Sequence, residues 1–133
     1  MEIRGEVSPS KAGEELFCVA SVLPLRGYRH VIPFMRMSMK VQRQLKTTPG
    51  LVRYAMKTDI PRKRFWTFTV WTDRKAMAAF VRTEPHATAV GRFGKWGGEG
   101  AGFAEWTSTE GKLDWNEVWE RLKKPTFGYG DRR

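Results

Sequence analysis

The chain is poor in the residues that most often build covalent or metal-based sites. Its 133 residues include one cysteine and two histidines. A lone Cys18 cannot form an intrachain disulfide, and within its apolar run it predicts a small buried side chain. One cysteine and two histidines far apart in the sequence cannot supply a tetrahedral metal site. We therefore expect neither a disulfide nor a metal centre.

Long hydrophobic runs are also missing. No segment approaches the roughly 20 apolar residues that cross a bilayer. The first residues, MEIRGEVSPSKAGEE, have no apolar core of the kind that a signal peptide carries. We expect no membrane span and a cytoplasmic location. No phosphate-binding glycine motif is present, and the five glycines of residues 94–102 predict a flexible loop.

Acidic residues are scarce in one third of the chain. Eleven lysines or arginines and one acid, Asp59, lie between Arg26 and Arg64, while the whole chain carries a formal charge of +10. Such a field attracts an anionic ligand, an acidic partner or nucleic acid. A solvated helix face followed by a basic turn has the same pattern. Because the charge is dispersed and no base-stacking motif accompanies it, nucleic acid is the less expected partner.

Hydrophobic periodicity predicts one α+β domain over residues 15–124, preceded by a flexible segment at 1–14 and followed by a tail at 125–133. Apolar or alternating runs predict strands at 15–23, 51–57, 64–71 and 103–109. Helical spacing predicts helices at 33–45 and 73–82 and a C-terminal helix from Asp114. The order β-α-β-β-α-β is the ferredoxin-like arrangement, with a four-stranded antiparallel sheet.

The alternation of the third strand predicts which residues share a face of that sheet. Trp66, Phe68 and Val70 fall on one side, and we assign that side to the helices, together with Tyr54 and Met56. The opposite side then carries Phe65, Thr67, Thr69 and Trp71. That surface is too apolar to face water, so the pattern predicts a symmetric homodimer with two sheets packed face to face.

A longer pattern, PGLVRYAMK followed by RFWTFTVWTDRKAMAAFVRTEPH, resembles the dimeric α+β barrel superfamily, and within it the antibiotic-biosynthesis-monooxygenase-like proteins. The matching residues, in order, are Pro49-Gly50, Trp71, Ala76 and Pro85-His86. The ending FAEWTSTEGKLDWNEVWERL is similar to uncharacterised bacterial members and, more loosely, to spheroidene-monooxygenase-like ones. The resemblance implies a dimeric barrel fold. It specifies the fold better than the reaction, because members include cofactor-free monooxygenases, haem-degrading enzymes, isomerases and proteins without known activity.

His86 is the candidate catalytic residue. Imidazole titrates near neutrality and can act as a general base, and it can also ligate haem iron. A hydrogen bond that braces a helix junction is the structural alternative. Phe80 and Val90 stand where haem-degrading members carry a tryptophan and a histidine, which argues against haem degradation by that route. We expect no cofactor, with haem ligation through His86 left open.

A second group of residues predicts a site for a flat apolar ligand. Aromatic and methionine side chains at these positions suit a polyketide or quinone, although a packed core has the same composition. Two further residues precede the first helix, where family members often line the pocket mouth. The candidate substrate-binding residues are Phe34, Met37, Tyr54, Met56, Trp66, Phe80, His30 and Arg29.

Three functions remain open from the sequence. The first is a monooxygenase-like or isomerase-like enzyme acting on an apolar aromatic ligand that can carry a negative charge. The second is a non-catalytic ligand-binding dimer of the same fold, with or without haem. The third is a basic protein that binds nucleic acid or an acidic partner through residues 26–64.

Overall fold

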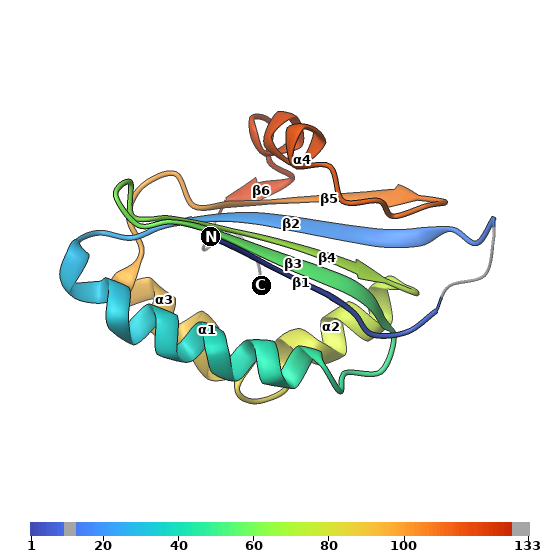
Figure 1. Ribbon diagram of the computed structural model, residues 1–133, viewed down its shortest axis with the longest axis horizontal. Helices are drawn as coiled ribbons and strands as arrows, with labels where there is room; N and C mark the ends of the chain where they lie inside the picture. Colours follow the sequence, from blue (N-terminus) through green and yellow to red (C-terminus); the bar gives the residue numbers. More distant parts are fainter. Residues whose placement is uncertain (10–12, 129–133) are drawn as a thin grey trace.

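The computed structural model describes residues 1–9 and 13–128, and within them six strands form one antiparallel sheet (Figure 1). The strands are β1 (Glu2–Glu6), β2 (Leu16–Pro24), β3 (Leu51–Asp59), β4 (Arg64–Trp71), β5 (Gly102–Ser108) and β6 (Phe127–Gly128). Their order across the sheet is β1-β3-β4-β2-β5-β6. The four central strands, β3-β4-β2-β5, have the ferredoxin-like order, which confirms the predicted α+β fold.

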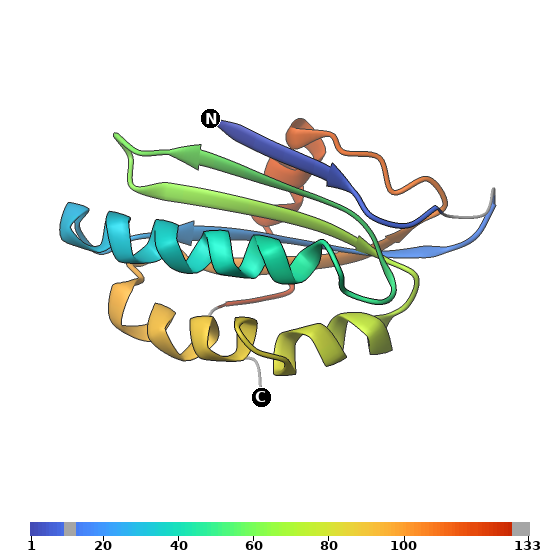
Figure 2. The same ribbon diagram turned by 60° about the horizontal axis from the view of Figure 1, so that its bottom comes forward.

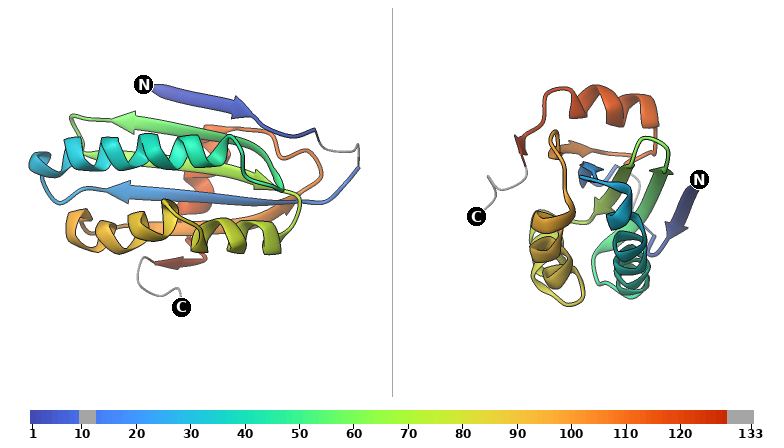
Figure 3. Two further views of the ribbon diagram at one scale, coloured as in Figure 1. Left: turned by 90° about the horizontal axis from the view of Figure 1, so that it is seen from below. Right: turned by 90° about the vertical axis from the view of Figure 1, so that its left-hand side faces the viewer.

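Helices lie on both faces of the sheet. They are η1 (Tyr28–His30), α1 (Val31–Leu45), α2 (Arg74–Arg82), α3 (His86–Trp96) and α4 (Trp115–Leu122). The helices α1, α2 and α3 lie together below one face, with α2 and α3 end to end beside α1 (Figure 2). The C-terminal α4 crosses the opposite face (Figure 3). None of the described helices is long and apolar enough to cross a membrane.

The sequence prediction omitted three elements at the edges of the domain. Residues 1–14 were expected to be a flexible segment, but Glu2–Glu6 pair with β3 in register, Glu2 opposite Lys57 and Glu6 opposite Arg53. Alternating charges hide this edge strand from a hydrophobicity pattern. In the predicted tail, Phe127–Gly128 pair with β5, while residues 129–133 lie outside the described part. The expected short turn after Pro85 is the helix α3, which shortens the predicted glycine loop to residues 97–101.

The two faces of β4 are the reverse of the prediction. Phe68 and Val70 belong to a cluster with α4, and Trp66 packs against that cluster. Trp71 packs with α1 and α2, and Phe65 packs beneath the start of α1. The prediction failed because α4 has its own aromatic stripe, so both faces of the sheet are covered within one chain. The argument for a homodimer from Phe65 and Trp71 therefore no longer holds.

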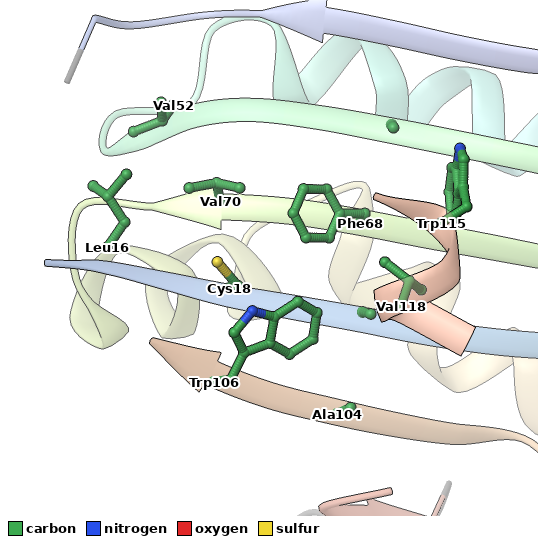
Figure 4. Packing of buried hydrophobic residues seen from close by; sticks show 11 residues of the cluster. Leu16, Cys18, Val52, Phe68, Val70, Ala104, Trp106, Trp115 and Val118 are labelled. Atoms are coloured by element: carbon green, nitrogen blue, oxygen red, sulfur yellow. The ribbon is translucent and has the colours of Figure 1, made fainter. Parts of the chain in front are cut away.

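The α4 face of the sheet is a closed core (Figure 4). Trp115 and Val118 of α4 close over side chains from four strands. The strand residues labelled there are Leu16, Cys18, Val52, Phe68, Val70, Ala104 and Trp106. The Trp115 indole N–H also donates to the Glu2 carboxylate at 3.0 Å, which ties α4 to the edge strand. Side-chain oxygens cap both helix starts, Asp73 accepting from the N–H of Ala76 and Asp114 from that of Asn116.

Gly50 gives the Pro-Gly motif a physical reason. Its φ is +84°, a conformation that side-chain-bearing residues rarely adopt, and an added Cβ would collide with the Cβ of Ala76 on α2. The two residues, both part of the family-like pattern, thus allow the turn before β3 to pack closely against α2.

We expect Gly50→Ala to lower the free energy of unfolding by about 1–3 kcal/mol, because it adds backbone strain and a steric clash. The matched control is Gly94→Ala, in the interior of α3, where an added Cβ meets nothing within 4 Å. There alanine should stabilise by up to about 1 kcal/mol. Urea unfolding of both variants checks this, and equal effects from the two would contradict the role given to Gly50.

Candidate ligand cavity

A cavity of about 370 Å³ lies between the sheet and the helices α1–α3. Its lining is mostly apolar, and all six methionines of the chain contribute to it. They are Met1, Met35, Met37, Met39, Met56 and Met77. Methionine is unbranched and polarizable, so it adapts to ligands of different shape and contacts aromatic rings favourably. The cavity thus has a deformable apolar wall of the kind that suits a flat aromatic ligand.

The structure brings most of the predicted site residues together at this cavity. The residues that line it are Phe34, Met37, Tyr54, Met56, Phe80 and His86, and Trp66 borders it as well. Arg29 and His30 are not part of the lining; they lie in η1, with the Arg29 Nε 3.4 Å from the His30 Nε2. Their predicted role in ligand binding is untested.

The indole of Trp66 is oriented differently from the prediction. We placed it on the face of α1–α3, but its ring packs edge-on against Trp119 of α4, with ring centroids 6.1 Å apart. Neighbouring side chains of a strand point to opposite faces, so with Phe65 and Thr67 facing the cavity Trp66 must face α4. Trp66 therefore reaches the cavity only at its border.

Hydroxyl groups on β2 and β4 form the floor of the cavity, and the sequence prediction missed them. Ser21 and Thr67 lie opposite each other on paired strands, and their hydroxyls are hydrogen-bonded. Thr69 follows on the same face and accepts a hydrogen bond from the Trp71 indole N–H at 2.8 Å. All four residues line the cavity. Thr67, Thr69 and Trp71 were assigned to a dimer interface, and correct facing of β4 would have identified them.

Tyr54 adds a polar group to the same chamber. It is buried, and its hydroxyl accepts from the Gln42 side chain of α1 at 3.4 Å. Together with the hydroxyl row, it gives an apolar ligand a few hydrogen-bonding points that can fix its orientation.

His86 is the first residue of α3, and its ring is held on two sides. The Nδ1 atom lies 3.3 Å from the carbonyl oxygen of Val81, and the ring packs on Phe80 with centroids 4.6 Å apart. A carbonyl oxygen can only accept, so this hydrogen bond requires a proton on Nδ1. In the neutral imidazole Nε2 is then the basic nitrogen.

Gln44 of α1 holds the backbone at this histidine. Its side-chain oxygen accepts from the His86 N–H at 3.0 Å, and its nitrogen donates to the Thr83 carbonyl at 3.2 Å. The first N–H groups of a helix have no partner within it, so the Gln44 amide satisfies one of them from a neighbouring helix. Gln44 thereby fixes the junction of α2 and α3 against α1.

Cys18 lies apart from this chamber. It belongs to the core on the α4 face, and burial raises the pKa of its thiol to about 11, so it is protonated at neutral pH. A thiolate nucleophile at Cys18 is thereby disfavoured. Among residues 1–9 and 13–128, no group of three His, Cys, Asp or Glu side chains is placed to hold a metal ion.

Comparison by sequence finds no matching family model and no matching curated protein. Comparison of structures does find matches. A conserved protein from Methanosarcina mazei aligns with a TM-score of 0.63 at 9% identity, over 71% of this chain and 94% of that one. A Nitrosomonas europaea protein, provisionally described as an antibiotic biosynthesis monooxygenase, aligns with a TM-score of 0.61 at 16% identity, over 75% of this chain and 95% of that one.

A third match is SnoaB from Streptomyces nogalater, described as a cofactor-independent oxygenase. It aligns with a TM-score of 0.55 at 14% identity, over 71% of this chain and 93% of that one. Likeness at such low identity concerns the fold. The chain therefore has the fold of the antibiotic-biosynthesis-monooxygenase-like proteins, as the Pro-Gly and Pro-His motifs predicted.

Proposed function

We propose that the protein is a monooxygenase-like or isomerase-like enzyme acting on a flat apolar aromatic ligand in the cavity. The observation that carries the proposal is the position of His86: it borders a methionine-lined chamber, and its hydrogen bond to Val81 makes Nε2 the basic nitrogen. Fold neighbours described as monooxygenases, one of them a cofactor-independent oxygenase, support the same class of reaction.

Both reactions begin with removal of a proton from the ligand. The Nε2 of His86 accepts that proton, and the ring is kept in place by Val81 and Phe80. The hydroxyls of the cavity floor hydrogen-bond to ligand oxygens. The apolar walls exclude water from the resulting anion, which can return the proton at another carbon or donate an electron to dioxygen.

Haem fits this cavity poorly. A haem carries two propionates, which need cationic partners, and Lys57 is the only lysine or arginine that lines the described cavity. Its ammonium lies on the other face of the sheet, 5.2 Å from the centroid of the Trp119 ring. We therefore derive no step through haem.

Replacing His86 with asparagine tests the proposal. The asparagine amide can donate to the Val81 carbonyl in place of Nδ1 but supplies no base. With a panel of aromatic hydroquinones and anthrones, we expect oxygen uptake to fall roughly 10²–10⁴-fold. Ligand binding and the melting temperature should stay near those of the wild type.

The same change at His30, the other histidine, should leave oxygen uptake intact because His30 lies outside the cavity lining. A ligand that binds both proteins without turnover would support the alternative, a non-catalytic ligand-binding protein. A lowered melting temperature with unchanged activity per folded molecule would make His86 a brace.

A homodimer is also part of the proposal, now on a different surface. At the β3–β4 end of the α4 face, Trp119 is 37% exposed and Ile60 is 44% exposed, and both border a shallow groove with Trp66. Exposed apolar side chains around a groove favour association. A second copy could cover this part of the sheet.

We expect sedimentation to show a dimer at micromolar concentration, and Trp119→Glu to weaken it about ten-fold or more. The matched change Trp96→Glu would disturb the cavity rather than this surface, so Lys112→Glu, on an exposed loop, serves as the control. A well-folded wild-type monomer at every concentration would exclude the dimer.

A further inference from the structure

One end of the molecule gathers much of the basic charge that the proposed reaction does not use. There the helix η1 and the start of α1 lie beside the β3–β4 hairpin and the end of α3 (Figures 1 and 2). Printed contacts join these segments: the Tyr28 hydroxyl donates to the Pro61 carbonyl at 2.5 Å, and the Arg26 N–H donates to the Trp96 carbonyl at 2.8 Å. We call this end the basic tip.

The basic tip has far more cations than acids. Its cationic side chains are Arg26, Arg29, Arg62, Lys63, Arg64 and Lys95. Two acids lie near them, Asp59 and Glu99, and Asp59 is paired with Arg62 at 3.1 Å. The tip therefore keeps a clear positive excess, which would attract an anionic surface.

Exposed apolar side chains lie among these cations. Ile32 is 66% exposed and Tyr28 is 59% exposed, and Pro33 is exposed beside them. The Lys63 ammonium lies 4.5 Å from the centroid of the Tyr28 ring. An aromatic ring, an isoleucine and surrounding cations are the composition of a segment that lies in the boundary between lipid headgroups and acyl chains.

We propose that the basic tip docks the protein on anionic lipid bilayers. Nucleic acid would satisfy the charge equally well, but it gives an exposed isoleucine and proline nothing to contact. The cavity also approaches this end: Met1 and Thr58 line it, are joined backbone to backbone, and directly precede the hairpin. A docked molecule would have its apolar chamber close to the phase in which apolar aromatic compounds dissolve.

Vesicle co-sedimentation tests the proposal without knowledge of the substrate. At about 100 mM salt, we expect the wild type to bind phosphatidylcholine vesicles containing about 30 mol% phosphatidylserine and not pure phosphatidylcholine vesicles. The double variant Arg26→Glu/Arg64→Glu should bind about twenty-fold more weakly, since each cation near an anionic surface contributes roughly five-fold. Arg26→Gln/Arg64→Gln repeats the test if the charge reversal fails to fold.

Two further variants separate the outcomes. Arg43→Glu/Lys46→Glu makes the same charge change at the far end of α1 and just beyond it, and should bind within about two-fold of the wild type. Ile32→Ser should weaken vesicle binding roughly five-fold with no change in net charge. Equal losses from the two charge variants, or no vesicle binding by the wild type, would overturn the proposal. So would an unaffected Ile32→Ser variant together with tight binding of a single-stranded oligonucleotide, which would make the tip a nucleic-acid surface.

Discussion

The sheet is apolar on both faces, and the way in which each face is covered determines the rest of the structure. On one face, Trp115 and Val118 of the short helix α4 are buried against the central strands, and the packing is that of a closed core. On the other face, three helices enclose a chamber as well as a core. Because α4 supplies a packed core on its own side, the opposite side can keep an open cavity at the expense of some packing. The division of labour between the two faces is the basis of the functional proposal.

The chemistry of the chamber follows from which strand residues face it. Alternation along β4 places Thr67 and Thr69 on the cavity floor, where Ser21 of β2 joins them. Buried hydroxyls are stable there because they hydrogen-bond to one another and to backbone and indole groups. The walls come from methionines on two helices and two strands, together with Met1. A polar floor under soft apolar walls suits a flat ligand that carries oxygen atoms on its rings.

The sequence predicted the central fold well and the faces of the sheet poorly. Strong periodicity located the four central strands, and the caps at Asp73 and Asp114 marked the starts of α2 and α4. Edge strands β1 and β6 are short, and β1 is charged, so neither shows a hydrophobic pattern. The face of Trp66 was assigned wrongly because a strand that is apolar on both sides gives no sign of which side meets which helix. A bulge between Leu51 and Arg53 likewise moved Val52 to the face opposite Tyr54.

The central claim is that the chamber under α1–α3 is the ligand site, and the methionines offer a direct test. All six of them line it, so every methionine methyl group is a reporter of its occupancy. In a protein labelled with ¹³C at the methionine methyls, titration with 1-naphthol should shift the signals of Met37, Met56 and Met77 in a saturable way. The Trp119 indole, on the other face, should keep its shift. Unmoved methionine signals together with a shifted Trp119 signal would place the ligand on the α4 face and contradict the account.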